Sequence, residues 1–83
     1  MAYRLVYTKS TLRDIKKLDR VVRKKLKNKI EIYSKFPMKH ARSLIDARIG
    51  SYRWRVGNYR IVFDIEEKDI VILRIRHRRE VYK

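Results

Sequence analysis

Apolar and polar residues alternate on both sides of Gly57-Asn58, over residues 52–56 and 59–63. A period of two is typical of β-strands, because successive side chains point to opposite faces of a sheet. Glycine and asparagine tolerate the positive φ angles that a two-residue turn requires. The pattern therefore predicts a β-hairpin.

The predicted hairpin brings arginines together. If its turn has only two residues, Arg55 lies directly opposite Arg60, and Arg53 lies opposite Val62. Like charges that face each other across a sheet are destabilising. A fold tolerates such a pair where an anion binds between the two side chains, and we interpret it as the first indication of function.

The rest of the chain predicts one strand and two helices before the hairpin, and one strand after it. Residues 3–7 alternate as in a short strand, whereas apolar residues recur at helical spacing over 12–18 and 22–33. Residues 37–50 form a connector, and residues 70–76 begin apolar on both faces, as in a central strand. We expect an α+β fold with the order β-α-α-β-β-β, a mostly antiparallel four-stranded sheet with two helices packed on one side.

The last strand is expected to extend the arginine-bearing face of the hairpin. If Val71, Leu73 and Ile75 continue its buried face, the residues between them point the other way. Arg74 and Arg76 would then share a face with the arginines of the hairpin.

The composition bounds the size and the partners of the protein. Residues 1–83 suffice for a single domain with one modest core. Twenty-four Lys and Arg residues against nine Asp and Glu residues give a net charge of +15 and a pI near 10.6. Such a charge attracts polyanions: nucleic acid, an anionic membrane or an acidic protein.

The sequence lacks the residues of several common sites. There are no cysteines, and His40 and His77 are the only histidines, so we expect no metal site. With Gly50 and Gly57 as the only glycines, neither a Walker A nor a dinucleotide-binding motif can form, and we expect no cofactor. No run resembles a signal peptide or a transmembrane segment, so we expect a cytoplasmic protein with no membrane partner.

Arginines gather on or beside one predicted face of the sheet. Guanidinium groups suit phosphate because their planar donors can engage two oxygens at once. Trp54 and Tyr59 lie on the apolar face and are expected in the core, whereas Arg74 and Arg76 fit a solvated strand end as well as a phosphate contact. The pattern predicts a phosphate-binding face and does not separate binding from cleavage. The candidate arginines are Arg53, Arg55, Arg60, Arg74, Arg76 and Arg78, interleaved with Tyr52, Trp54, Tyr59 and Tyr82.

Two stretches resemble a known family. Residues 52–63, Tyr-Arg-Trp-Arg-Val-Gly-Asn-Tyr-Arg-Ile-Val-Phe, and residues 73–82, Leu-Arg-Ile-Arg-His-Arg-Arg-Glu-Val-Tyr, closely resemble the RelE group of bacterial and archaeal toxins. The resemblance covers essentially the whole chain. RelE-like toxins are ribosome-dependent endoribonucleases that cut mRNA in the ribosomal A site and are neutralised by an antitoxin. The resemblance thus implies a cognate antitoxin, the ribosome and mRNA as partners, and metal-independent attack by a ribose 2′-hydroxyl on the adjacent phosphate.

The resemblance also implies roles for individual residues. Arg53 and Arg55 match positions that are lysine in the best-known members, and Arg60 matches the arginine that stabilises charge on the phosphate. Arg78 matches an arginine linked to leaving-group protonation, and Tyr82 matches a tyrosine that stacks on a substrate base. We expect these five residues to be catalytic. The residues expected to bind RNA beside them are Arg74, Arg76, His77 and Arg79.

Arg55 departs from the family pattern. An arginine is a poor general base, because its pKa stays above about 12. The reaction would then depend mainly on electrostatic stabilisation of the phosphorane and on alignment of the substrate by the ribosome.

Two other functions are compatible with the sequence. The related ParE toxins share the fold but inhibit DNA gyrase and have no nuclease activity, and a non-catalytic nucleic-acid-binding domain is a further alternative. The Arg53/Arg55 pair and the ending over residues 77–82 favour the ribonuclease, because the gyrase-directed group generally lacks them.

Overall fold

The computed structural model describes residues 3–43 and 52–77. The expected α+β fold is confirmed, and the expected connector adds a short helix and a two-residue strand. The elements in chain order are β1 (Arg4–Tyr7), α1 (Lys9–Lys16), α2 (Arg20–Tyr33), α3 (Pro37–His40), β2 (Arg42–Ser43), β3 (Tyr52–Val56), β4 (Tyr59–Glu66) and β5 (Asp69–His77).

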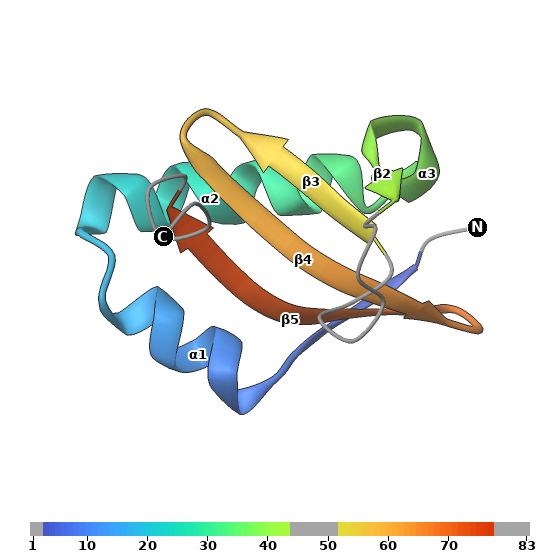
Figure 1. Cartoon of the computed structure of the whole chain (residues 1–83), viewed down its shortest axis with the longest axis horizontal. Coiled ribbons are helices and arrows are strands. Elements are labelled where there is room, and N and C mark those ends of the chain that lie inside the picture. Colours follow the sequence, from blue (N-terminus) through green and yellow to red (C-terminus); the bar gives the residue numbers. More distant parts are fainter. Residues whose placement is uncertain (1–2, 44–51, 78–83) are drawn as a thin grey trace.

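The strands form one sheet in the order β1-β5-β4-β3-β2. β1 runs parallel to β5, and every other neighbouring pair is antiparallel. In Figure 1, α2 crosses behind the sheet and α1 lies beside the end of β5. Within the part of the chain that the structure describes, no helix covers the face of β3, β4 and β5 that points toward the viewer.

Local signals set the helix starts and the hairpin turn. Thr8 is the N-cap of α1 and accepts a hydrogen bond from the amide of Thr11 at 3.3 Å. Asp19 caps α2 in the same way, accepting from the amide of Val22 at 2.9 Å. Such caps satisfy amide groups that have no partner in the first turn of a helix. In the hairpin turn Gly57 has φ 58°, a value that favours glycine.

The core lies between α2 and the sheet. Leu26 and Ile30 of α2 pack against buried residues of β3, β4 and β5. Trp54 is fully buried, and its Nε1 donates a hydrogen bond to the carbonyl oxygen of Pro37 at 3.0 Å. Tyr59 is partly buried against the same cluster. The expected core positions of Trp54 and Tyr59 are therefore confirmed.

β5 contains one more residue than the part of β4 that it pairs with. Val62 pairs with Arg74, and the next residue, Phe63, pairs with Ile72. Leu73 is the extra residue between these two pairs, and it forms a β-bulge. A bulge interrupts the alternation of side chains, so the two halves of β5 differ in phase.

The bulge corrects the expected buried face of β5. Ile70 and Ile72 are fully buried before the bulge, and Ile75 is buried after it. Val71 and Leu73 are only partly buried. The expectation that Val71 and Leu73 continue the buried face was wrong, because the first half of β5 turns its isoleucines to the core and the bulge then brings Ile75 onto the same side.

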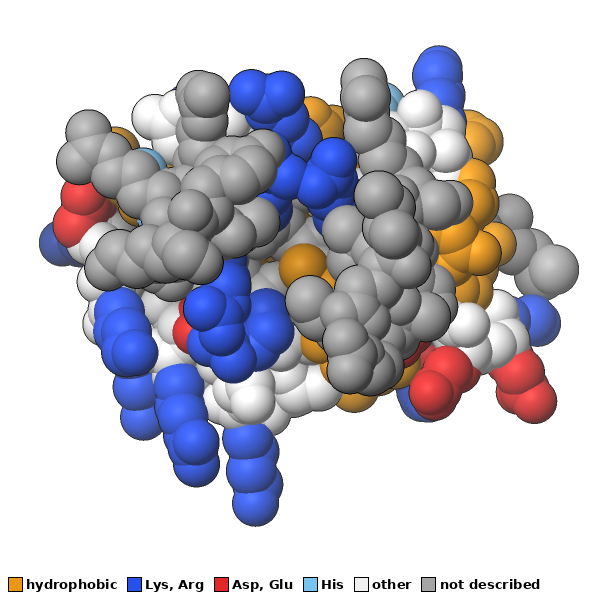
Figure 2. All heavy atoms as spheres, in the orientation of Figure 1, with side chains coloured by type: hydrophobic (Ala, Val, Ile, Leu, Met, Phe, Trp, Pro, Cys, Tyr) orange, Lys and Arg blue, Asp and Glu red, His pale blue; other side chains and the backbone are white. Residues whose placement is uncertain are grey.

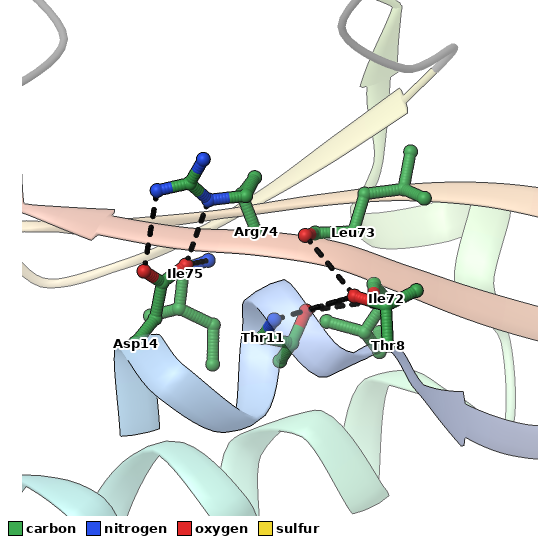
Figure 3. A network of polar contacts seen from close by, with 7 residues as sticks. All are labelled: Thr8, Thr11, Asp14, Ile72, Leu73, Arg74 and Ile75. Atoms are coloured by element: carbon green, nitrogen blue, oxygen red, sulfur yellow. Dashed lines mark hydrogen bonds and ion pairs between the residues drawn. The ribbon is translucent and has the colours of Figure 1, made fainter. Parts of the chain in front are cut away.

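α1 binds the edge of β5 where β1 has ended (Figure 3). The carbonyl oxygen of Ile72 accepts hydrogen bonds from the hydroxyl groups of Thr8 at 2.9 Å and Thr11 at 2.7 Å. The amide of Ile75 donates to Oδ2 of Asp14 at 2.9 Å. Buried backbone groups need such partners. The side chains of α1 and of its N-cap, Thr8, therefore take the place of a neighbouring strand and hold the second half of β5 in position.

Candidate functional site

Three arginines lie in a row across the sheet. Arg55 of β3 pairs in register with Arg60 of β4, and Arg60 pairs with Arg76 of β5. The predicted Arg55–Arg60 pair is confirmed, and Arg76 lies on the same face, as expected. Because neighbouring strands are about 4.8 Å apart, the row spans about 10 Å.

A second row lies one step further along the strands. Arg53 of β3 pairs with Val62, and Val62 pairs with Arg74 of β5. Residues two apart on a strand share a face, so both rows lie on the side of the sheet away from α2. We call Arg53, Arg55, Arg60, Arg74 and Arg76 the arginine face.

The arginine face combines exposed and partly buried guanidinium groups. Arg55 is exposed, whereas Arg53, Arg60 and Arg76 are partly buried. Water screens a partly buried charge less than a fully exposed one, so these side chains act more strongly on a bound anion. Figure 2 shows Lys and Arg side chains over the middle of this face and around α1 at the lower left.

Arg74 has a carboxylate partner on α1. Its Nε and Nη2 donate to Oδ2 and Oδ1 of Asp14 at 3.0 and 3.3 Å (Figure 3). The side chain of Asp14 is only 10% exposed and that of Arg74 is 35% exposed. The pair fixes Arg74 at the border of the arginine face and turns two of its donors toward α1. An RNA-binding role for Arg74 stays a prediction.

A pocket of about 120 Å³ opens beside the arginine face. Arg53, Arg55 and Arg60 line it together with two aromatic rings, Tyr33 of α2 and His40 of α3. The two rings are stacked, with centroids 4.3 Å apart and planes 18° apart. The sequence interpretation missed this pair, because it placed Tyr33 in an apolar helical stripe and considered His40 only as a metal ligand. The short helix α3, which the sequence interpretation did not include, carries His40 back to the end of α2.

His77 lies on the other face of the sheet from its neighbour Arg76. It pairs in register with Tyr59, and the two rings meet edge to face with centroids 5.1 Å apart. Tyr59 packs against the core, so His77 lies at the end of the sheet on the core side. An RNA-binding role for His77 also stays a prediction.

Three candidate residues, Arg78, Arg79 and Tyr82, lie outside the residues that the structure describes. Their roles as catalytic or RNA-binding residues stay predictions from the family resemblance.

A larger hollow of about 230 Å³ lies between α1, α2 and the end of β5. Its lining is mostly apolar, with Leu12, Ile15 and Leu26 among its residues, and it is suited to apolar side chains rather than to phosphate. Within residues 3–43 and 52–77, no three His, Cys, Asp or Glu side chains are grouped so that they could hold a metal ion. None of the described helices combines the length and the apolar composition needed to span a membrane.

Comparisons of sequence and of structure both find toxins of the RelE/ParE superfamily. The family model of the ParE toxin of the type II toxin–antitoxin system parDE matches residues 5–82. The curated toxin RelE3 of Methanocaldococcus jannaschii is 28% identical over 88 residues, covering 95% of this chain and 94% of the relative.

Two solved structures illustrate the structural similarity. The RelBE2 toxin–antitoxin complex of Mycobacterium tuberculosis contains a chain with a TM-score of 0.85 and 26% identity, covering 94% of this chain and 93% of that chain. A mutant of the Escherichia coli toxin RelE in the free state has a TM-score of 0.74 and 27% identity, covering 99% of this chain and 92% of that chain.

The chain therefore belongs to the family of ParE toxins of type II toxin–antitoxin systems. Its similarity to the RelE toxins makes it a RelE-type member of the RelE/ParE superfamily.

Proposed function

We propose that this toxin is a ribosome-dependent mRNA endoribonuclease that inhibits translation. The observation that supports the proposal is the row of Arg55, Arg60 and Arg76 on the face of the sheet away from α2. Arginines carried side by side on neighbouring strands suit a phosphodiester whose negative charge increases in the transition state. The RelE names of the similar toxins favour this activity.

In the proposed reaction a ribose 2′-hydroxyl attacks the adjacent phosphorus and gives up its proton to solvent water. The bond from phosphorus to the 5′ oxygen of the next nucleotide breaks, and that oxygen takes up a proton. The products are a 2′,3′-cyclic phosphate and a 5′-hydroxyl group. Arg53, Arg55 and Arg60 stabilise the charge on the phosphorane, Arg78 assists protonation of the leaving oxygen, and Tyr82 stacks on a base. Because arginine does not accept a proton at neutral pH, the main contributions of these arginines are electrostatic stabilisation and alignment.

Cleavage on programmed ribosomes tests the proposal. Purified toxin is mixed with ribosomes that carry a defined mRNA, and the cut sites are mapped by primer extension. We expect cuts within the codon in the A site, and no cuts in the same mRNA without ribosomes. An mRNA that stays intact on ribosomes, with toxin in excess, would contradict the proposed activity.

Inhibition of DNA gyrase is the second candidate function, because the matching family model is named for ParE. A supercoiling assay with purified gyrase separates the two candidates. We expect supercoiling to proceed at toxin concentrations that cleave mRNA on ribosomes. Inhibition of supercoiling without any mRNA cleavage would assign the chain to the gyrase-directed group instead.

We also propose a cognate antitoxin as the neutralising partner, acting in the cytoplasm where ribosomes are found. The net charge of +15 favours a partner that is acidic, or that carries an amphipathic helix with acidic flanks, and that covers the arginine face or displaces Tyr82. Solved complexes of RelB with RelE are among the similar structures. Binding should raise the melting temperature of the toxin, because the partner binds the folded state and reduces its self-repulsion. A basic partner, or one that docks only on the helical side without altering residues 77–83, would contradict this interpretation.

A further inference from the structure

The stacked pair of Tyr33 and His40 lines the pocket beside the arginine face. Tyr33 is held from below by Trp54, since their rings meet edge to face with centroids 5.9 Å apart and planes 67° apart. Trp54 is itself fully buried and donates a hydrogen bond to the carbonyl oxygen of Pro37 at the start of α3. Tyr33 therefore has a fixed position, and His40 lies against one face of its ring while remaining exposed.

The pocket beside this pair combines two kinds of chemistry. Arg53, Arg55 and Arg60 offer guanidinium donors that suit a phosphate, and the rings of Tyr33 and His40 offer a flat surface. Its volume of about 120 Å³ is well below the roughly 300–1,000 Å³ of sites for drug-sized molecules, so it fits one small group at a time. A single-stranded nucleic acid presents such groups in alternation, because each phosphate is followed by a base with a π face.

We propose that Tyr33 and His40 form a base-stacking subsite for the nucleotide whose phosphate binds Arg53, Arg55 and Arg60. One nucleobase stacks on the exposed face of His40, and Tyr33 supports that ring from behind. This inference rests on the proposed function, because it assigns a substrate contact to the same arginines. It makes His40 a substrate-binding residue, with Tyr33 as the positioning residue behind it.

The chemistry of the pocket favours a nucleotide over a simple anion or an acidic peptide. Either of those would be satisfied by the arginines alone and would gain little from a stacked aromatic pair. Base–aromatic stacking is sequence-tolerant, and its loss weakens binding by roughly 5- to 150-fold per base. The subsite would therefore raise the affinity for mRNA without selecting a codon.

The test compares two ligands on two residues. The ligands are a fluorescently labelled hexanucleotide with 2′-O-methyl riboses, which cannot be cleaved by 2′-hydroxyl attack, and the same backbone with abasic sites. The variants are His40→Ala, His40→Phe and, as a control that removes a neighbouring charge, Lys39→Ala. Binding is measured by fluorescence anisotropy at one fixed salt concentration, and thermal melts check that each variant is folded.

We expect His40→Ala to weaken binding of the hexanucleotide by at least about fivefold and to leave binding of the abasic strand nearly unchanged. His40→Phe keeps a ring and should retain most of the affinity. Lys39→Ala should weaken both ligands equally and modestly, because it removes only charge.

Equal losses for both ligands in His40→Ala would overturn the inference, since they would mean that His40 acts only through charge. The inference would also be overturned if an acidic peptide such as hexaglutamate bound as tightly as the hexanucleotide and its affinity fell equally in His40→Ala. The ribosome cleavage assay keeps this inference separate from the proposed function. If the wild type cleaves mRNA but His40→Ala does not weaken the hexanucleotide more than the abasic strand, the subsite is refuted and the proposed nuclease function stands. If His40→Ala weakens the hexanucleotide selectively but the wild type does not cleave mRNA, the subsite stands and the nuclease function is refuted.

Discussion

Arg55 and Arg60 face each other across β3 and β4, one residue pair away from the pair that closes the Gly57-Asn58 turn. Arg60 faces a second arginine, Arg76, on its other side. Facing like charges are destabilising, so the pairing of Arg60 with Arg55 and with Arg76 does not itself stabilise the sheet. We expect a phosphate to bind over Arg60, where all three arginine side chains can help to balance its negative charge.

The first prediction follows from this central position. Arg60→Ala should lower the rate of mRNA cleavage on ribosomes by on the order of 10²-fold or more, because it removes a charge that acts most strongly in the transition state. Arg60→Lys should recover part of the rate, since it keeps the charge and loses the bidentate geometry. Single-turnover cleavage measures both effects.

A control and a melt complete this experiment. Arg20→Ala removes the same side chain from the exposed surface of α2 and should cleave at the wild-type rate. The melting temperature of Arg60→Ala should stay close to that of the wild type, because the loss of one of three adjacent like charges relieves repulsion. Normal cleavage by Arg60→Ala would exclude this residue from the site, and a much lower melting temperature would show that it is structural.

The second prediction concerns Asp14, which holds both the backbone of Ile75 and the side chain of Arg74. Asp14→Ala should lower the free energy of unfolding by about 1–3 kcal/mol, because a buried amide loses its acceptor. Asp14→Asn keeps an oxygen acceptor for that amide and should be less destabilising. Urea denaturation of the three proteins gives the comparison, and equal midpoints for Asp14→Ala and the wild type would refute the structural role.

The sequence predicted the hairpin and its arginines because the signals are local. A two-residue turn sets the register of a hairpin, so the pairing of Arg55 with Arg60 follows from Gly57-Asn58 alone. The side of the sheet that meets α2 follows from the alternation of apolar residues around Trp54. These features need no knowledge of distant parts of the chain.

Other parts of the site depend on contacts that a linear pattern does not contain. Residues 70–73 are apolar on both faces, so the sequence offers no sign of the bulge at Leu73. The role of Asp14 arises because β1 ends before β5 does, which leaves an edge for α1 to bind. The stacking of His40 on Tyr33 depends on the path of α3.

The third prediction concerns acid stability and the pair of Arg4 and Asp69, which links β1 to β5. Arg4 donates to Oδ1 and Oδ2 of Asp69 at 2.9 and 3.0 Å. These hydrogen bonds hold the pKa of Asp69 below its ordinary value. A lowered folded-state pKa contributes stability above the unfolded pKa of about 3.9, and the contribution is lost as the pH falls through the folded-state pKa.

Asp69→Asn tests this contribution. Its melting temperature should be slightly below that of the wild type near neutral pH, and the difference should shrink and vanish as the pH falls below about 3.9. The difference should be small, because both side chains are accessible to water and ions screen the pair. A difference that grows toward acid pH would have the wrong sign for this pair.

The fourth prediction separates the arginine face from the overall charge of the protein. Binding of single-stranded RNA should weaken steeply with salt, because each neutralised phosphate releases counterions and makes the negative slope of log affinity against log salt steeper by about 0.7. Arg76→Ala should make that slope less steep by about 0.7, since Arg76 belongs to the row of Arg55, Arg60 and Arg76. Lys25→Ala removes the same charge from the exposed surface of α2 and should leave the slope nearly unchanged. Equal slopes for the two variants would mean that RNA binding depends on the net charge alone. An affinity that does not change with salt would exclude a mainly electrostatic interaction.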